Sequence, residues 1–243
     1  TPAHTAAAAG NQEILKTLGD FGFDFNTAGK FFSSHNGLTA LHVASQNGQL
    51  NAAQFLIENG ANPNATTHNG CTPLHFAAQN GHKALVDLLI QNKAQTEHPN
   101  KNGETALQLA IVAGRVETVN ALIAKVPSFI CNNRTNSTLL HLACQSGNPD
   151  IVRRVIDSIP LDQRNIINAR DIEGNTPLHI ATMRNFLKII NILIISQADA
   201  TIKNNRYKTP FFYASSEAAK KFRDYFKTDG VIQAMMSNRK QQS

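Results

Sequence analysis

The sequence has no tryptophan and three cysteines among its 243 residues. Cys71, Cys131 and Cys144 are odd in number and include no CxxC pair, so they indicate neither a disulfide framework nor a four-ligand zinc site. Long apolar runs are also missing: residues 189–195 form the longest one and Asn191 interrupts it, whereas a membrane-spanning helix needs about 20 apolar residues. We therefore expect no membrane span and a reducing, intracellular compartment, the cytoplasm.

Catalytic motifs are absent as well. The sequence contains no GxSxG, no Walker loop and no GxGxxG, and carboxylates such as Glu104 and Glu173 stand singly, without a paired acid or base. His141 and Cys144 lie three positions apart, but Cys144 follows a fixed alanine of the repeat described below, where a small buried side chain is the ordinary explanation. For this chain the sequence predicts no enzyme and no cofactor.

The N-terminal residues TPAHTAAAAG contain neither an initiator methionine nor the pattern of a signal peptide. We interpret the chain as an excised piece of a longer protein. The apolar fraction of 42% is high enough to build a core, which excludes disorder over most of the chain.

The net charge of +6 is unevenly distributed, since residues 1–100 carry −2 and residues 101–243 carry +8. A basic C-terminal end raises nucleic acid or anionic lipid as an alternative partner. We do not favour this alternative, because the basic residues, Arg153 and Arg154 among them, are expected on different faces and no aromatic stripe alternates with them.

A repeat of 33 residues is the main signal. Seven threonines open similar segments at spacings of 33 or 38 residues, and an alanine stands five residues after each threonine. The threonines are Thr1, Thr39, Thr72, Thr105, Thr138, Thr176 and Thr209. The alanines are Ala6, Ala44, Ala77, Ala110, Ala143, Ala181 and Ala214. This spacing predicts stacked copies of one small unit, called repeats one to seven below.

Each repeat is predicted to contain two helices. Threonine is a good N-cap, and the proline that follows it in four repeats already has a helical φ, so a first helix begins there. In five repeats a glycine stands nine residues after the threonine and can adopt the left-handed conformation that ends a helix. The fixed alanine predicts the close approach of a neighbouring helix. A second helix and a polar turn rich in asparagine and glycine complete the repeat.

Residues 69–94, NGCTPLHFAAQNGHKALVDLLIQNKA, resemble the TPLHxAAxxGH pattern of the ankyrin repeat family. The resemblance covers about seven repeats over residues 1–226 and leaves residues 227–243 as a C-terminal tail or linker. It implies an all-α repeat solenoid, in which helix-turn-helix units joined by β-hairpin loops form a curved stack. Repeat seven departs most strongly, because Phe212 replaces the histidine and Ala218 the glycine, so we interpret it as cap-like.

Histidines at the TPLH position recur in five repeats, as His4, His42, His75, His141 and His179. In the ankyrin family this imidazole hydrogen-bonds to loop backbone, which is a structural role. No two of the chain's nine histidines stand at a metal-binding spacing, and a zinc ion needs ligands that converge. We therefore predict no metal site.

The resemblance also implies where a partner binds. In this family the hairpin tips and the two residues before the first-helix glycine line the concave face and vary with the partner. The corresponding tip residues are His35, Asn36, Leu38, His68, Asn69, Cys71, Lys101, Asn102, Glu104, Arg134, Thr135, Ser137, Ile172, Glu173, Asn175, Asn205, Arg206 and Lys208. The helix-end residues are Gln46, Asn47, Gln79, Asn80, Val112, Gln145, Ser146, Met183 and Arg184.

The chemistry of this row changes along the chain. Amides dominate its beginning, Val112 contributes to a small apolar spot in the middle, and Arg134, Arg184 and Arg206 dominate its end. We expect a monomer that binds a protein or extended peptide with an acidic portion; a merely solvated face is the alternative for each residue. The 26 asparagines, about three times an ordinary share, fit an AT-rich genome and hence a host-directed bacterial effector or a parasite protein acting in host cytoplasm.

A third hypothesis makes the chain a substrate. Leu18, Asp24 and Asn26 match the L(x5)DxN pattern of ankyrin repeats that an oxygen-dependent hydroxylase modifies on asparagine. Asn26 is therefore a candidate hydroxylation site, whereas Asn64 fits less well because Asn62 replaces the acid.

Two insertions lengthen the period to 38 residues. The first carries Phe31 and Phe32, which either pack over the edge of the stack or anchor a partner. The second precedes repeat six and contains Arg164 and Arg170. We expect it to be a longer loop.

Overall fold

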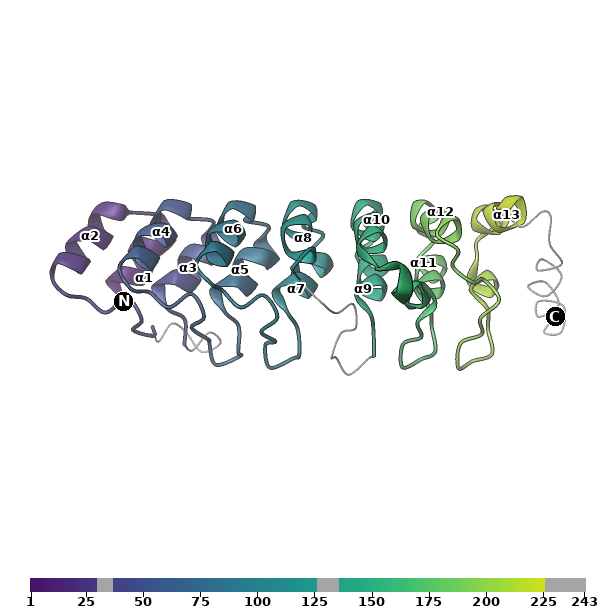
Figure 1. Cartoon of the computed structure of the whole chain (residues 1–243), viewed down its shortest axis with the longest axis horizontal. Coiled ribbons are helices and arrows are strands. Elements are labelled where there is room, and N and C mark those ends of the chain that lie inside the picture. The colour runs from purple at the N-terminus through teal and green to yellow at the C-terminus, as the bar shows by residue number, and fades with distance from the viewer. Residues whose placement is uncertain (30–36, 126–135, 226–243) are drawn as a thin grey trace. The chain divides into compact units, whose positions relative to one another are not determined.

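A computed structural model describes residues 1–29, 37–125 and 136–225 of the chain (Figure 1). The chain divides into an N-terminal body, Thr1–Val126, and a C-terminal body, Pro127–Ser243. Secondary structure in the described ranges is helical, with an isolated bridge between Gly29 and Leu38 and no longer strand. The all-α prediction is therefore confirmed. The insertion with Phe31 and Phe32, Cys131, and residues 226–243 lie outside the described ranges.

The N-terminal body contains four helix pairs. The first helices pack on one another in chain order, and the second helices do the same, so that two layers form (Figure 1). The first helices are α1 (Pro2–Ala9), α3 (Ala40–Asn47), α5 (Pro73–Asn80) and α7 (Ala106–Val112). The second helices are α2 (Gln12–Asp20), α4 (Leu50–Glu58), α6 (Lys83–Gln91) and α8 (Val116–Ile123).

The C-terminal body has the same two layers, with two differences. A 3-10 helix is inserted after α10, and a 3-10 helix replaces the first α-helix of repeat seven. Helix α9 packs on α11, α10 packs on α12, and the last repeat adds η2 and α13. The α-helices are α9 (Leu139–Ser146), α10 (Pro149–Ser158), α11 (Pro177–Met183), α12 (Leu187–Ile195) and α13 (Ser216–Tyr225). The two 3-10 helices are η1 (Leu161–Asn168) and η2 (Pro210–Tyr213). The first of them follows α10, and the second stands where repeat seven should have its first α-helix.

The seven threonines are the N-caps of α1, α3, α5, α7, α9, α11 and η2, as predicted. In α3 the ring of His42 completes a capping box, since its Nδ1 accepts a hydrogen bond from the Thr39 backbone N–H at 3.0 Å. The fixed alanines are buried in all seven repeats, as the prediction of a close neighbouring helix requires.

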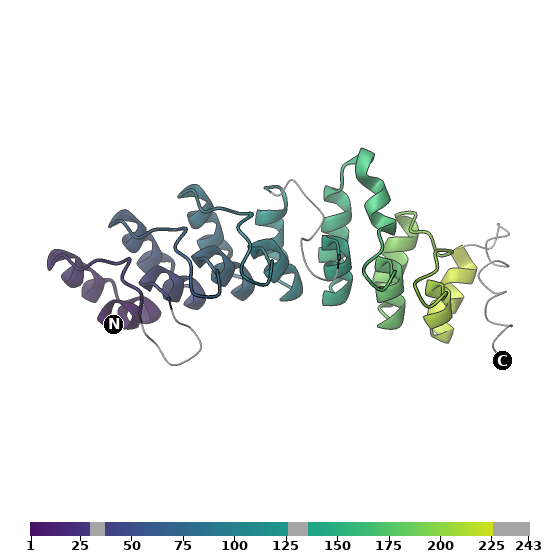
Figure 2. The ribbon, with the colours of Figure 1, turned by 90° about the horizontal axis from the view of Figure 1, so that it is seen from below.

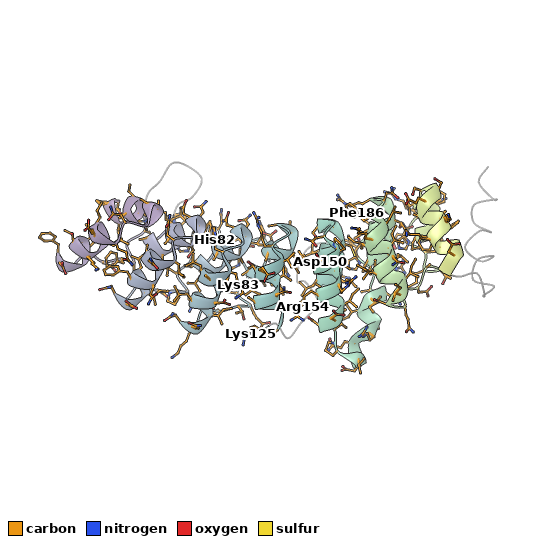
Figure 3. The ribbon with its side chains drawn as sticks, turned by 90° about the horizontal axis from the view of Figure 1, so that it is seen from above. His82, Lys83, Lys125, Asp150, Arg154 and Phe186 are labelled. Atoms are coloured by element: carbon orange, nitrogen blue, oxygen red, sulfur yellow. The ribbon has the colours of Figure 1, made fainter. Side chains whose placement is uncertain are left out.

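Four of the five first-helix glycines have a second role that the sequence did not indicate; the exception is Gly114, where a Cβ would meet nothing within 4 Å. Gly48 has φ +75°, and a Cβ built there would lie 2.7 Å from the ring of His82 in the next repeat. His82, at the turn between α5 and α6 (Figure 3), donates from Nε2 to the backbone oxygen of Gln46 at 3.1 Å. Arg115 makes the same contact over Gly81. Glycine is therefore needed both for backbone conformation and for space.

The insertion before repeat six is a 3-10 helix rather than a loop. A residue before proline avoids the α conformation, so Ile159 is extended (ψ 121°) and α10 ends at Ser158, ahead of Pro160. Other repeats turn back at the corresponding position with a left-handed residue, such as Gly60 or Gln197. The chain after α10 instead continues outward as η1.

Candidate functional site

The predicted partner-binding residues differ in exposure. Those with exposed side chains are Gln46, Asn47, His68, Asn69, Gln79, Asn80, Lys101, Asn102, Val112, Gln145, Ile172, Glu173, Met183, Arg184 and Arg206. Cys71, Glu104, Ser146 and Lys208 are half-buried. Leu38, Ser137 and Asn175 are buried. His35, Asn36 and Arg134 lie outside the described residues.

The buried and half-buried tip residues share one position, directly before the N-cap threonine. In five repeats the backbone oxygen at this position accepts a hydrogen bond from the histidine of the preceding repeat, which holds the loop backbone against that repeat. His42 Nε2 donates to Cys71 O at 3.1 Å, and His141 Nε2 donates to Asn175 O at 3.0 Å. The expectation that this position presents its side chain to a partner is wrong for Leu38, Ser137 and Asn175, which are buried, and Cys71 is half-buried rather than exposed.

The structural role of the TPLH histidines is confirmed by these hydrogen bonds. Each ring accepts at Nδ1 from its N-cap threonine and donates at Nε2 to the next loop, as in His75, which donates to Glu104 O at 3.1 Å. This pattern requires a neutral imidazole. Desolvation accordingly lowers the pKa of all five rings, and it lowers that of His42 to about 4.

A hollow of about 250 Å³ opens in the C-terminal body where the ends of α9 and α11 meet the loop between them. It is called the front hollow below. Its lining consists of Ser137, Gln145, Asp171, Ile172, Glu173, Asn175, Ile180, Met183 and Arg184. Most of these residues were predicted to bind a partner; Asp171 and Ile180 were not, since neither occupies a tip or helix-end position.

The loop at the front hollow is held rigidly by its own side chains. Asp171 Oδ1 accepts hydrogen bonds from the backbone N–H groups of Glu173 at 2.9 Å and Asn175 at 2.8 Å. The buried Asn175 accepts from Asn204 Nδ2 at 2.8 Å, which ties this loop to the next one. Ile172 is thereby presented with 63% of its surface exposed. A preformed loop loses little conformational entropy when a partner binds.

Charge in the front hollow is mixed. The Asp171 carboxylate is occupied by the loop backbone, and the Glu173 carboxylate accepts from Asn175 Nδ2 at 3.2 Å. The exposed Arg184 caps the end of α11 and takes part in no ion pair among the described residues. Its guanidinium is therefore the group in the hollow that is available to an external carboxylate.

Aromatic residues of repeat seven divide into an inner and an outer set. Phe211 and Phe222 are buried, with ring centroids 5.8 Å apart. Tyr207 is 80% exposed, and Lys208 Nζ lies 4.0 Å from the centroid of the Phe212 ring. The inner pair fills the interior beside α12, and the outer residues extend the exposed surface of the loop tips.

The cysteines in the described ranges are poorly suited to nucleophilic chemistry. Burial raises the pKa of the fully buried Cys144 thiol, and it also raises the pKa of Cys71. His141, the nearby base considered from the sequence, uses both ring nitrogens in structural hydrogen bonds. This geometry offers no thiolate and no free base.

Asn26, the candidate hydroxylation site, connects two repeats. Its Nδ2 donates to Gly60 O at 2.9 Å and its Oδ1 accepts from Asn62 N–H at 2.8 Å. Asn64 makes the equivalent bonds, to Lys93 O and from Gln95 N–H. The two asparagines are therefore alike structurally, although their sequence patterns differ.

Within the described ranges, no helix has the length and apolarity to span a membrane. The same residues contain no group of three or more histidine, cysteine, aspartate or glutamate side chains placed to hold a metal ion.

Comparison with known proteins agrees with the geometry. The sequence profile of the family described as "Ankyrin repeats (3 copies)" matches residues 1–67, 63–129 and 124–204. Among solved structures, the ankyrin repeat domain of human ASB11 matches with a TM-score of 0.75 and 26% identity, covering 97% of this chain and 96% of that one. The ankyrin repeat domain of Bcl-3, a member of the IkappaB family, has the same fold (TM-score 0.75, 23% identity, 92% of this chain and 98% of that one).

A curated relative shares a shorter stretch. FPV219 of fowlpox virus (strain NVSL), named as an ankyrin repeat protein, is 49% identical over 39 residues, which is 16% of this chain and 9% of the viral protein. The family profile, by contrast, spans most of the chain. The capped helix pairs, the histidine bonds between repeats and this match together show that the chain belongs to the ankyrin repeat family.

Proposed function

We propose that the chain is a non-catalytic module that binds a partner protein or an extended peptide along the surface where first-helix ends meet loop tips. Ankyrin repeat domains generally mediate protein–protein interaction, and their fold is typically non-catalytic. In each body, taken by itself, the loops project from one side of the helix pairs (Figure 1). Side chains on that side are consequently accessible to a partner.

The front hollow is the observation that carries the proposal. It combines a preformed loop, a guanidinium and two apolar side chains, Ile172 and Met183, of which 63% and 42% of the surface is exposed. Exposed apolar groups beside a directional polar group are typical of interface cores. An extended segment of a partner could place one apolar side chain here.

The first repeats offer hydrogen bonds from glutamine rather than asparagine. Asn47 and Asn80 donate their side-chain amides to their own helices, to Val43 O at 2.8 Å and Phe76 O at 2.9 Å. Gln46 and Gln79 are exposed and make no such side-chain bond among the described residues. We therefore assign the amide recognition of the N-terminal body to the two glutamines.

Replacing Gln145, Met183 and Arg184 together by alanine is expected to weaken partner binding by about tenfold or more, because residues that fill an interface core dominate its energy. The three side chains are exposed, so folding should be unchanged. The measurement is capture from a lysate of cells that produce the protein, with quantitative mass spectrometry of the bound proteins.

A matched control changes Arg153, Lys188 and Asn191 to alanine, which are exposed on α10 and α12 of the same body. Proteins lost by the front variant and kept by the control identify the partner. Identical sets bound by the parent and both variants would contradict the proposal.

Recognition of an acidic portion of the partner predicts a salt-dependent effect. Reversing charge in Arg184→Glu with Arg206→Glu should weaken binding of the captured partner by about tenfold at low ionic strength, and less at high salt, because screening removes long-range attraction. The control is Arg153→Glu with Lys188→Glu, which makes the same change in net charge. Equal binding by both double variants in a titration over salt concentration would show that the partner site is not cationic.

A further inference from the structure

A second and larger hollow lies on the C-terminal body, away from the loop tips. Its volume is about 440 Å³, and it is called the η1 hollow below. The lining residues come from η1 and from the end of α12: Leu161, Arg164, Asn165, Ile167, Asn168, Ile195, Ser196 and Gln197. It shares no residue with the front hollow. In Figure 2 the green η1 segment stands out from the paired helices of this body.

The walls of the η1 hollow are fixed in place. Ile159 and Ile167 are buried, which anchors the helix at both ends. Asn168 Oδ1 accepts a hydrogen bond from the backbone N–H of Asp199 at 2.8 Å, which ties the end of η1 to the segment after α12. On the opposite side Gln197 adopts φ +65° and turns the chain sharply at the end of α12. The hollow is therefore built by the insertion rather than by the repeat.

Two large aliphatic side chains in the lining face water. Leu161 is 84% exposed and Ile195 is 61% exposed. They belong to different elements, η1 and the last turn of α12. Apolar side chains left exposed around a hollow gain stability when an apolar group from a partner covers them.

The polar groups of the η1 hollow indicate the charge of its occupant. Arg164 is the one charged residue in the lining. It is exposed and takes part in no ion pair or side-chain hydrogen bond among the described residues. Asn165 and Gln197 are likewise exposed and make no side-chain hydrogen bond within the same ranges. The lining thus offers a cation and two free amides but no carboxylate.

We infer that the η1 hollow is a second peptide-binding site, which takes an aliphatic side chain between Leu161 and Ile195 and a neighbouring carboxylate on Arg164. The amides of Asn165 and Gln197 can hydrogen-bond the backbone of such a peptide. The guanidinium favours a carboxylate partner in a planar, two-bond geometry. A small free anion would leave the aliphatic walls uncovered, so an acidic, aliphatic peptide matches the lining better.

A phage-displayed library of random linear peptides tests this inference. Peptides selected on the intact chain should carry aspartate or glutamate next to leucine, isoleucine or valine. Their affinity should fall by about tenfold or more in two variants, Arg164→Glu and the pair Leu161→Ser with Ile195→Ser. These three side chains are exposed, and circular dichroism and thermal unfolding verify that the variants remain folded.

The front-hollow variant, with Gln145, Met183 and Arg184 changed to alanine, is the matched control and should bind the same peptides unchanged. Selected peptides that are lost in this control and kept in the η1 variants would overturn the inference while supporting the proposed function. Peptides that depend on Leu161 but carry no acidic residue would overturn the assignment to Arg164. A library from which no η1-dependent peptide is enriched would also overturn the inference.

Discussion

Acidification from about pH 7.5 to about pH 4.5 is expected to lower the free energy of unfolding by several kcal/mol, because the buried TPLH histidines must remain neutral. His42 shows the reason most clearly. Its Nδ1 accepts from the Thr39 N–H and its Nε2 donates to Cys71 O. A second proton on the ring would abolish the acceptor and place a charge in the interior.

The direction of the effect follows from the lowered pKa. Desolvation lowers the pKa of His42 from 6.5 to about 4 in the folded protein. The unfolded chain therefore binds a proton at higher pH than the folded one, and stability is present above pH 6.5 and is lost as the pH falls toward about 4. For His42 alone the full loss is about 3 kcal/mol. The pKa values of His4, His75, His141 and His179 are lowered too, so their contributions have the same sign.

Another repeat of the same chain, in which glutamine holds the histidine position, suggests the control. Repeat four has Gln108 in place of the histidine, and Gln108 Oε1 accepts from the Thr105 N–H at 3.1 Å. His42→Gln should therefore keep the capping box but lose the titration. Urea unfolding over this pH range should show a smaller pH dependence for His42→Gln than for the parent. A flat parent profile, or an unchanged slope in the variant, would refute the interpretation.

Replacing Gly48 with alanine is expected to destabilise the N-terminal body by about 2–4 kcal/mol, for two reasons that add. The residue has φ +75°, which a side chain disfavours, and the new Cβ would lie 2.7 Å from the His82 ring. His82 is half-buried and bound to Gln46 O, so moving the ring away sacrifices a hydrogen bond between repeats.

Gly60 is the control that separates the cost of the left-handed backbone conformation from the cost of the contact with His82. It lies in the same repeat with φ +84°, but a Cβ there would meet nothing within 4 Å. Lys93 already holds the corresponding position in the next repeat at φ +64°. Gly60→Ala should therefore destabilise by about 1 kcal/mol, the conformational part alone. Gly48→Ala combined with His82→Ala should be less destabilising than the sum of the single changes in urea unfolding. Equal losses for Gly48→Ala and Gly60→Ala would show that the His82 contact is unimportant.

Much of the fold follows from short-range signals. Threonine caps, the prolines behind them and the left-handed glycines act through groups within one or two helical turns, so their positions predict where helices start and end. Repeat seven shows the limit of such signals. Thr209 still caps a helix, but Ala218 lies within α13 where other repeats end their first helix, and only the short η2 forms.

The candidate surface was predicted less completely. The exposed Met183 and Arg184 were predicted as partner-binding residues because they lie at the end of the first helix in their repeat. Leu38, Ser137 and Asn175 were expected at a tip but are buried. The backbone oxygens of Leu38 and Asn175 accept a hydrogen bond from a histidine about one repeat earlier in the chain, but that of the half-buried Cys71 does so too, and this bond alone does not decide which side chains are buried. Their position directly before the N-cap threonine distinguishes them from the exposed tip residues, but the sequence did not indicate that this position is buried.

The sequence by itself determined the family, the number of repeats and the positions of most helix ends, because a regular spacing of capping residues and buried alanines has one consistent structural solution. Only the tertiary structure decided which tip side chains remain accessible and that Leu161 and Ile195 meet around a hollow. These features depend on contacts between residues that lie about one repeat apart. Such contacts arise from packing of whole repeats, and the local pattern of residues does not encode them.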